Sequence, residues 1–310
     1  MKKISIIIPT RNEELNIEDM VFTIKDIFKE KLCEYDYEII ITDNKSNDNT
    51  REIVKRLCEE DKKIKAIFNS SSFSYSAINA LVSASGDSAI LLCADFQDPP
   101  DLLPDFIEEW KKGCDVVVGV KQDSEEKSIL KFMRRIYYKV LAKISDYPLI
   151  EGFSTYALYD RHFLDVLASV SDPLLYLRGL VAELTDNIAI IEYKKQERKK
   201  GKSKNNFLRL YDFAMRGITS YSKTPMRLAT ILGTVGCFTS IFVGAFYLVR
   251  KLLHWNNLEA GIMPIIVLII LFGSLQLLIL GIMGEYIVNI NIRVMNHPRI
   301  VEDCRINFDK

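Results

Sequence analysis

Two long apolar runs without a single charge occupy residues 228–249 and 262–284 of the chain. Each is long enough to cross a hydrocarbon core of roughly 30 Å as a helix. A helix buried inside a protein core is the alternative, but two such runs joined only by RKLLHWNNLEAG (250–261) favour a transmembrane hairpin. The link is too short for a folded domain, so both flanks are expected on one side of the membrane.

Basic residues indicate that this side is the cytoplasm. The segment KKQERKKGKSK (194–204) precedes the first run. Further basic residues flank the hairpin at Arg209, Arg216, Lys223, Arg227, Arg293, Arg299 and Arg305. The positive-inside bias predicts a multi-pass protein whose N-terminal domain and both termini are cytoplasmic. Arg250 and Lys251 in the link argue mildly the other way.

The chain before the basic segment alternates β-rich apolar runs with helical patterns. The runs are KISIIIP, YEIIIT, IKAIF, AILLC and DVVVG, and the helical patterns cover 14–29, 49–61, 76–85 and 101–112. This alternation predicts a doubly wound α/β fold with a mostly parallel sheet. No GxGxxG follows the first run and no GxxxxGK[ST] occurs, which disfavours a dinucleotide oxidoreductase or a P-loop NTPase.

Composition narrows the class of partner and compartment. The 41 basic and 41 acidic residues cancel, so the overall charge gives no indication of a nucleic-acid partner. Six cysteines without a CxxC pair fit reduced thiols in the cytosol. The opening MKKISIIIPTRNEE is broken by Pro9 and then by charges, so we interpret it as a first strand and not as a secretion signal.

Acidic residues follow three of the predicted strands, at Glu13, Asp43 and Asp95. Because the carboxyl ends of parallel strands form the ligand-binding edge of such sheets, these side chains are expected at one rim. Without a His or Cys cluster, Asp95 and Asp98 suit a hard cation such as Mg²⁺ or Mn²⁺. The alternatives are ordinary: Asp98 caps the next helix, and Asp48 or Ser46 caps the helix beginning near Thr50.

The motifs IIPTRNEE, TDNKSNDNT and ADFQDPPD, a basic GKSK segment and two C-terminal spans resemble family 2 glycosyltransferases of the dolichol-phosphate-mannose-synthase type. The tail GIMGEYIVNINIRVMNHPRIV is most similar to the bacterial membrane enzymes that load a sugar onto undecaprenyl phosphate. The resemblance covers essentially the whole chain. It implies a GT-A catalytic domain over 1–205, a juxtamembrane amphipathic helix over 206–227, two transmembrane helices within 228–290 and a cytoplasmic tail over 291–310.

The resemblance also implies roles for individual residues at the donor site. Asp43 and Asn44 match the acidic element that holds the nucleobase and ribose, and Pro9 and Glu13 match the first nucleotide-contacting loop. Asp95 matches the metal-binding acid of the D-x-D motif and is also expected to be catalytic and to contact the nucleotide. Gln97, a further candidate metal ligand, and Asp98, a further candidate catalytic residue, match the Gln-Asp pair after it.

Two positions depart from the family pattern. Cys93 stands in place of the first acid of D-x-D among the nucleotide-contacting residues, and a neutral thiol is a poor ligand for a hard cation. Thr155 falls where many relatives carry an Asp near the acceptor phosphate. A phosphate acceptor is ionised at neutral pH, so a strong base is not required there. Asp160-Arg161 is interpreted as the start of the next helix.

Basic residues are candidates for binding the acceptor phosphate and the donor diphosphate: Arg178, Arg198, Lys202 and Lys204, with Arg178 and Lys202 assigned catalytic roles. A solvated loop attracted to anionic lipid is the alternative. The amphipathic stretch 127–145 is either an interfacial helix or a core-packed surface helix, and 206–225 leads into the first span.

Together these features predict an inverting, metal-dependent transfer of a sugar from a nucleotide-diphosphate sugar to undecaprenyl phosphate at the bacterial cytoplasmic membrane. A UDP-linked sugar is the donor that we expect. A processive polysaccharide synthase is disfavoured because the chain lacks Q-x-x-R-W. A non-catalytic nucleotide-sugar-binding protein is the other alternative, raised by Cys93 and Thr155. The sequence leaves the oligomeric state open, including a homo-oligomer.

Overall fold

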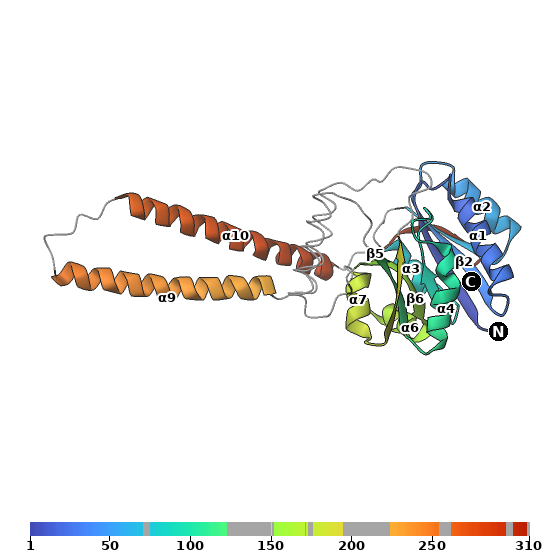
Figure 1. The fold of residues 1–310 in the computed structure, drawn as a ribbon. Coiled ribbons are helices and arrows are strands. Elements are labelled where there is room, and N and C mark those ends of the chain that lie inside the picture. The colour runs from blue at the N-terminus through green and yellow to red at the C-terminus, as the bar shows by residue number, and fades with distance from the viewer. Residues whose placement is uncertain are drawn as a thin grey trace.

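The computed structural model describes residues 1–70, 75–122, 150, 152–170, 172, 176–194, 224–253, 262–295 and 300–308. An eight-stranded sheet lies between two layers of helices, and two long helices extend away from it (Figure 1). Arg198, Lys202, Lys204, the stretch 127–145, all but the last two residues of 206–225, and 254–261 in the link lie outside the described residues.

The strands are β1 (Lys3–Thr10), β2 (Asp36–Asn44), β3 (Ile64–Asn69), β4 (Ser88–Leu91), β5 (Val116–Gln122), β6 (Phe153–Asp160), β7 (Ile188–Lys194) and β8 (Glu302–Ile306). Their order in the sheet is β7-β5-β6-β4-β1-β2-β3-β8. Four neighbouring pairs are parallel; β6 runs antiparallel between β4 and β5, and β8 runs antiparallel to β3. The predicted mostly parallel α/β sheet is confirmed, with β1–β5 at the five predicted runs.

The helices are α1 (Ile17–Glu30), α2 (Thr50–Glu60), α3 (Ser76–Val82), the 3-10 turn η1 (Pro100–Leu102), α4 (Leu103–Lys111), α6 (Arg161–Ser169), α7 (Leu177–Leu184), α9 (Thr224–Leu253) and α10 (Ile262–Met295). Ile4, Ile6 and Ile8 of β1 face the layer with α1, α2 and α4, whereas Ile7 faces α3, α6 and α7. Because both faces are covered, the central parallel strands β1 and β2 each contain an unbroken buried apolar run, Ile6–Ile8 and Ile39–Ile41.

Helix ends agree with local sequence signals at α6. The Asp160 carboxylate accepts a hydrogen bond from the His162 backbone N at 2.8 Å, so the predicted helix start at Asp160-Arg161 is confirmed. Strand β4 ends at Leu91, so Cys93 lies beyond the strand in which we had expected it. The antiparallel strand β6 was not predicted.

Helices α9 and α10 cover the two predicted apolar runs, contact each other and run in opposite directions (Figure 1). Within the described residues, one segment, Leu271–Met295 with mean hydropathy 1.7, is long and apolar enough to cross a membrane. A membrane crossing by both helices therefore stays a prediction. The inner end of α10 is attached to the α/β part, because Arg293 pairs with Asp172 at 2.9 Å.

The segment after α10 returns to the sheet and forms its edge strand β8. Cys304 pairs with Phe68 and Glu302 pairs with Asn69, so the register shifts at Asp303. From the sequence we expect a cytoplasmic tail over 291–310, and β8 is not among the five predicted strands. The chain after the apolar helices is thus part of the α/β sheet, as its edge strand.

Candidate active site

The carboxyl ends of β4, β1, β2 and β3 are neighbours in the sheet. We call this edge, with the loops that follow these strands, the rim. At the rim Thr10 pairs with Asp43, and Asn44 pairs with Asn69. The predicted donor-site residues lie at the carboxyl ends of β1 and β2 and in the loops after β1 and β4, and so at one edge, the ordinary ligand edge of such a sheet.

Asp43 is fully buried at the end of β2. Its Oδ2 accepts hydrogen bonds from Arg51 Nε at 2.6 Å and from the Ser46 backbone N at 3.2 Å. A second Arg51 nitrogen, Nη2, donates to the backbone oxygen of Asn69 at 2.7 Å. Arg51 therefore fixes the Asp43 carboxylate and balances its charge where burial alone would be costly.

Three buried side-chain oxygens at the ends of β2 and β3 have no hydrogen-bond partner: Asp43 Oδ1, Asn44 Oδ1 and Asn69 Oδ1. The Asn69 amide is oriented by its Nδ2, which donates to Thr42 Oγ1 at 3.0 Å. Buried acceptors are nearly always satisfied in folded proteins, and leaving one unpaired costs ~1–3 kcal/mol. This cluster is therefore suited to a ligand that supplies N–H or O–H donors.

The loops after β1 and β2 hold each other. The Asn12 N donates to Ser46 Oγ at 2.8 Å, and the Asn47 N donates to Asn12 Oδ1 at 2.9 Å. Glu13 accepts a hydrogen bond from the Asn16 side chain at 2.8 Å, at the entry to α1. Glu13 thus has a structural task besides the nucleotide contact predicted for it, and Ser46 joins the loops instead of capping α2.

Asp48, which comes just before α2, forms hydrogen bonds to the first residue of this helix. Asp48 Oδ1 accepts hydrogen bonds from the Thr50 N at 3.1 Å and from Thr50 Oγ1 at 2.6 Å. The helix cap itself is Asn49, which makes no side-chain cap bond. Asp48 therefore stabilises the first residue of α2, close to the capping role considered for it.

Asp95 lies half-buried in the turn that follows β4. Its Oδ1 accepts a hydrogen bond from the Gln97 backbone N at 3.2 Å, and Phe96 between them has a left-handed φ of 59°. Non-glycine residues seldom adopt this conformation, so the turn is specifically shaped. Among the described residues, no group of three or more His, Cys, Asp or Glu side chains is arranged to hold a metal ion.

Asp98 is buried and joins the turn to two distant strands. Its Oδ1 accepts a hydrogen bond from Tyr193 OH of β7 at 2.6 Å and lies 3.1 Å from Lys121 Nζ of β5. The neighbouring Pro99 oxygen accepts a bond from Tyr156 OH at 2.8 Å. Asp98 does not cap the following helix, because η1 has no side-chain cap. The alternative assignment of Asp98 as a cap is wrong.

The two positions that depart from the family pattern lie near the neighbouring strands β4 and β6: Cys93 comes two residues after the end of β4, and Thr155 is part of β6. The pairing of β4 with β6 ends at Leu91 and Ala157, and the β5–β6 register shifts between Ala157 and Phe153, the stretch that contains Thr155. Thr155 has a φ of 85°, an outlier for a β-branched residue. Desolvation by the surrounding protein and the nearby carboxylates of Asp98 and Asp95 raise the pKa of the Cys93 thiol. The thiol is therefore protonated at neutral pH and a poor cation ligand.

Arg178 lies in the first turn of α7. Its positive charge acts on Tyr159, a buried residue of β6 whose pKa is raised by desolvation and lowered in part by Arg178. Helix α7 contacts β6, so Arg178 belongs to an element packed against that strand. Its contact with a substrate phosphate stays a prediction.

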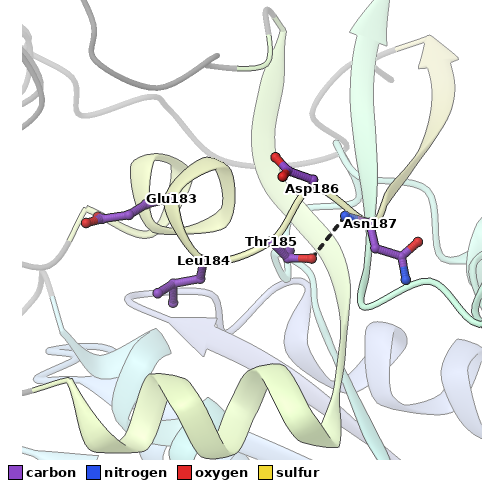
Figure 2. A pocket seen from close by; sticks show the side chains of 5 residues that line it. All are labelled: Glu183, Leu184, Thr185, Asp186 and Asn187. Carbon is purple, nitrogen blue, oxygen red and sulfur yellow. Dashed lines mark hydrogen bonds between the residues drawn. The ribbon is translucent and has the colours of Figure 1, made fainter.

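A hollow lies at the opposite end of the sheet, in the loop between α7 and β7. It is lined by Glu183, Leu184, Thr185, Asp186 and Asn187 (Figure 2). The Asn187 backbone N donates to Thr185 Oγ1 at 3.0 Å, which holds the loop closed on itself. Because this loop precedes β7, a strand parallel to β5, it lies at the amino ends of these strands and away from the rim.

A family model described as glycosyl transferase family 2 matches residues 5–167. The SfII prophage-derived bactoprenol glucosyl transferase of Shigella flexneri is 30% identical over 302 residues, which are 96% of this chain and 97% of that protein. The chain belongs to glycosyl transferase family 2. It is a glycosyltransferase, and the family and enzyme class expected from the motifs are confirmed.

Solved structures support the fold of this family 2 member. Mannosyl-3-phosphoglycerate synthase from Rubrobacter xylanophilus matches with a TM-score of 0.52 and 15% identity, over 76% of this chain and 75% of that chain. The likeness confirms a GT-A-like, mostly parallel sheet. A second match is glucosyl-3-phosphoglycerate synthase from Mycobacterium tuberculosis, in complex with Mn²⁺, UDP-glucose and phosphoglyceric acid. Its TM-score is 0.48 at 16% identity, over 70% of this chain and 78% of that chain.

Four residues of this site were not predicted: Arg51, Asn69, Lys121 and Tyr193. Asn69 ends a parallel strand, so the same strand-end argument that selected Asp43 applies to it. Arg51 lies in the first turn of α2 and carries no local signal of its contact with Asp43. Lys121 and Tyr193 reach Asp98 only through the pairing of β5 with β7.

Proposed function

We propose that the protein transfers a sugar from a UDP-linked donor to a polyprenyl phosphate at the membrane surface. The observation that carries the donor assignment is the group of unpartnered buried oxygens of Asp43, Asn44 and Asn69. A uracil base offers one N–H donor and a ribose offers hydroxyl donors. These groups match acceptors that are otherwise unsatisfied, and their pairing would recover the desolvation cost.

A divalent cation fits the rim only as a site completed by substrate. Asp95 is the carboxylate that would hold Mg²⁺ or Mn²⁺, with donor diphosphate oxygens and water as the remaining ligands and Gln97 beside it. When bound, the ion would neutralise charge on the leaving nucleotide diphosphate. Lys121, next to Asp98, adds a positive charge from the protein at the same turn.

The assignment of polyprenyl phosphate as the acceptor rests on the chemistry of phosphate attack and on the similarity to the Shigella protein. The Shigella protein is named a bactoprenol glucosyl transferase, and 97% of it is covered. A phosphate oxygen of the lipid would attack the anomeric carbon, the bond to the nucleotide diphosphate would break, and the configuration would invert. Because the attacking oxygen is already ionised at neutral pH, Thr155 in place of an acid does not prevent transfer.

The long helices supply the membrane location of this proposal. Exposed apolar side chains cover them, among them Phe238, Phe242, Leu277 and Ile287. Apolar surface of this extent needs a lipid or protein environment. We propose that α9 and α10 both cross the cytoplasmic membrane, with the α/β part on the cytoplasmic side, so that the rim meets acceptor phosphates at headgroup level.

A substrate screen tests the proposal. The purified full-length protein is incubated with undecaprenyl phosphate, Mn²⁺ and each of several UDP-, GDP- and dTDP-sugars, and lipid products are measured by mass spectrometry. The expected result is a polyprenyl-phosphate sugar from one UDP-sugar. Turnover with GDP-sugars alone would contradict the donor, and glycan chain growth without a lipid-linked monosaccharide would contradict the acceptor.

A further inference from the structure

Arg51 connects two parts of the chain that lie far apart in the sequence. Besides its bonds to Asp43 and to the Asn69 backbone, its Nη1 donates to Asp303 Oδ2 at 3.1 Å. Its guanidinium carbon lies 5.4 Å from the centre of the Phe68 ring. One planar group thus touches β2, β3 and β8, and each partner restricts its orientation.

The β3–β8 pairing directs Asp303 toward Arg51. The register passes from Cys304 opposite Phe68 to Glu302 opposite Asn69, which leaves Asp303 as the extra residue of a bulge. Bulges re-aim a side chain that regular pairing would direct elsewhere. The shift occurs beside Asn69, whose backbone oxygen and free Oδ1 belong to the candidate site.

We propose that Asp303 is a positioning residue of the donor site, acting through Arg51 on the Asp43 carboxylate. The inference rests on the proposed function, because it assigns the geometry of Asp43 to donor binding. Arg51 and Asp303 share a charge-assisted bond, so Asp303 limits the positions open to the guanidinium. Arg51 in turn holds Asp43 Oδ2, and this leaves Oδ1 directed at the nucleoside.

The strand that carries Asp303 follows α10 in the chain. The C-terminal segment is therefore part of the donor site's support, although the site's own residues all belong to the first part of the chain. Asp303 acts on binding and not on the reacting atoms, so its loss affects the donor KM and leaves kcat near the wild-type value. Because the Asp303 side chain is 40% exposed, a modest effect of ~2- to 5-fold is expected.

The test compares Asp303→Asn, Asp303→Glu and a control, Asp36→Asn, in the full-length protein. Asp36 is a matched carboxylate because it is 44% exposed, pairs with Lys63 at 2.6 Å and lies at the other end of the strand that carries Asp43. UDP affinity and the donor KM and kcat are measured with the UDP-sugar identified by the screen. Asp303→Asn is expected to raise KM ~2- to 5-fold and to weaken UDP binding equally, with kcat unchanged. Asp303→Glu keeps the carboxylate, so its KM and UDP affinity are expected to stay close to the wild-type values. Asp36→Asn is expected to change neither quantity.

An Arg51→Gln background tests whether Asp303 acts through Arg51. There Asp303→Asn is expected to add nothing to the donor KM, and an equal rise in both backgrounds would overturn the inference. An unchanged KM and UDP affinity in Asp303→Asn, with the wild-type protein binding UDP, would overturn this inference alone. A wild-type protein that binds no UDP would overturn the donor assignment and this inference with it. Melting curves of each variant identify a loss that merely reflects unfolding.

Discussion

Replacing the buried Asp98 carboxylate is expected to lower the free energy of unfolding by an amount that its contacts predict. Only 3% of the residue is exposed, and it is paired with Lys121 and with the Tyr193 hydroxyl. Asp98→Asn keeps an oxygen for Tyr193 but leaves the Lys121 charge without its partner. Loss of a charged hydrogen bond costs ~1.5–3 kcal/mol, and Lys121 keeps some access to water, so we expect about 2 kcal/mol.

That loss lowers the melting temperature by about 4–8 °C for a domain of this size. Differential scanning fluorimetry of the detergent-solubilised protein measures it, with Asp101→Asn as control because Asp101 is exposed three residues further along. The double variant Asp98→Asn/Lys121→Met removes both charges and is expected to melt closer to the wild-type protein. An unchanged melting temperature in Asp98→Asn, or a double variant less stable than the single one, would refute this reasoning.

Three further predictions concern Asp95, Cys93 and Glu38. Asp95→Asn is expected to lower kcat by at least ~100-fold. Its melting temperature is expected to stay within ~2 °C of wild type, since Asn keeps the oxygen that accepts the Gln97 bond. Near-normal, metal-dependent turnover would show that Asp95 does not hold the metal. Cys93→Asp is expected to keep or raise activity and to lower the Mn²⁺ concentration for half-maximal rate, because a carboxylate replaces a protonated thiol beside Asp95; a folded but inactive variant would disprove it. Glu38 is desolvated, which opposes its charge, but bonds from Lys3, Lys65 and Ser5 lower its pKa from 4.5 to about 2. The carboxylate therefore adds about 3 kcal/mol of stability above pH 4.5, which is lost as the pH falls toward 2. Urea unfolding of wild type and Glu38→Gln measures it, and a difference that persists at pH 2 would contradict the assignment.

The parts of the fold that the sequence predicted are those with local signals. Strands β1 to β3 contain buried apolar runs whose ends lie within one or two residues of the predicted limits. Helix α1 repeats its buried apolar residues at helical spacing. The strand-end rule brought Asp43 and Asp95 to one rim because parallel strands share an edge.

Other parts depend on contacts between distant residues. β8 reads EDCRI, with exposed charges and no apolar alternation, and it is a strand because it pairs with β3 more than 230 residues earlier. The role of Arg51 requires Asp43 and Asp303 together, which no local pattern links. The assignment of Asp98 as a helix cap failed for the same reason, since its partners Lys121 and Tyr193 come from strands brought beside it by the sheet.

The central claim is that the unpartnered oxygens of Asp43, Asn44 and Asn69 bind the nucleoside of a UDP-linked donor. A structure of the full-length protein with UDP, resolved well enough to place the base and ribose, tests it most directly through the distance from Asp43 Oδ1 to the nearest nucleotide donor atom. The account predicts a uracil N–H or a ribose hydroxyl within about 3 Å of this oxygen. A nucleotide bound elsewhere, with Asp43 Oδ1 still lacking a partner, would contradict it.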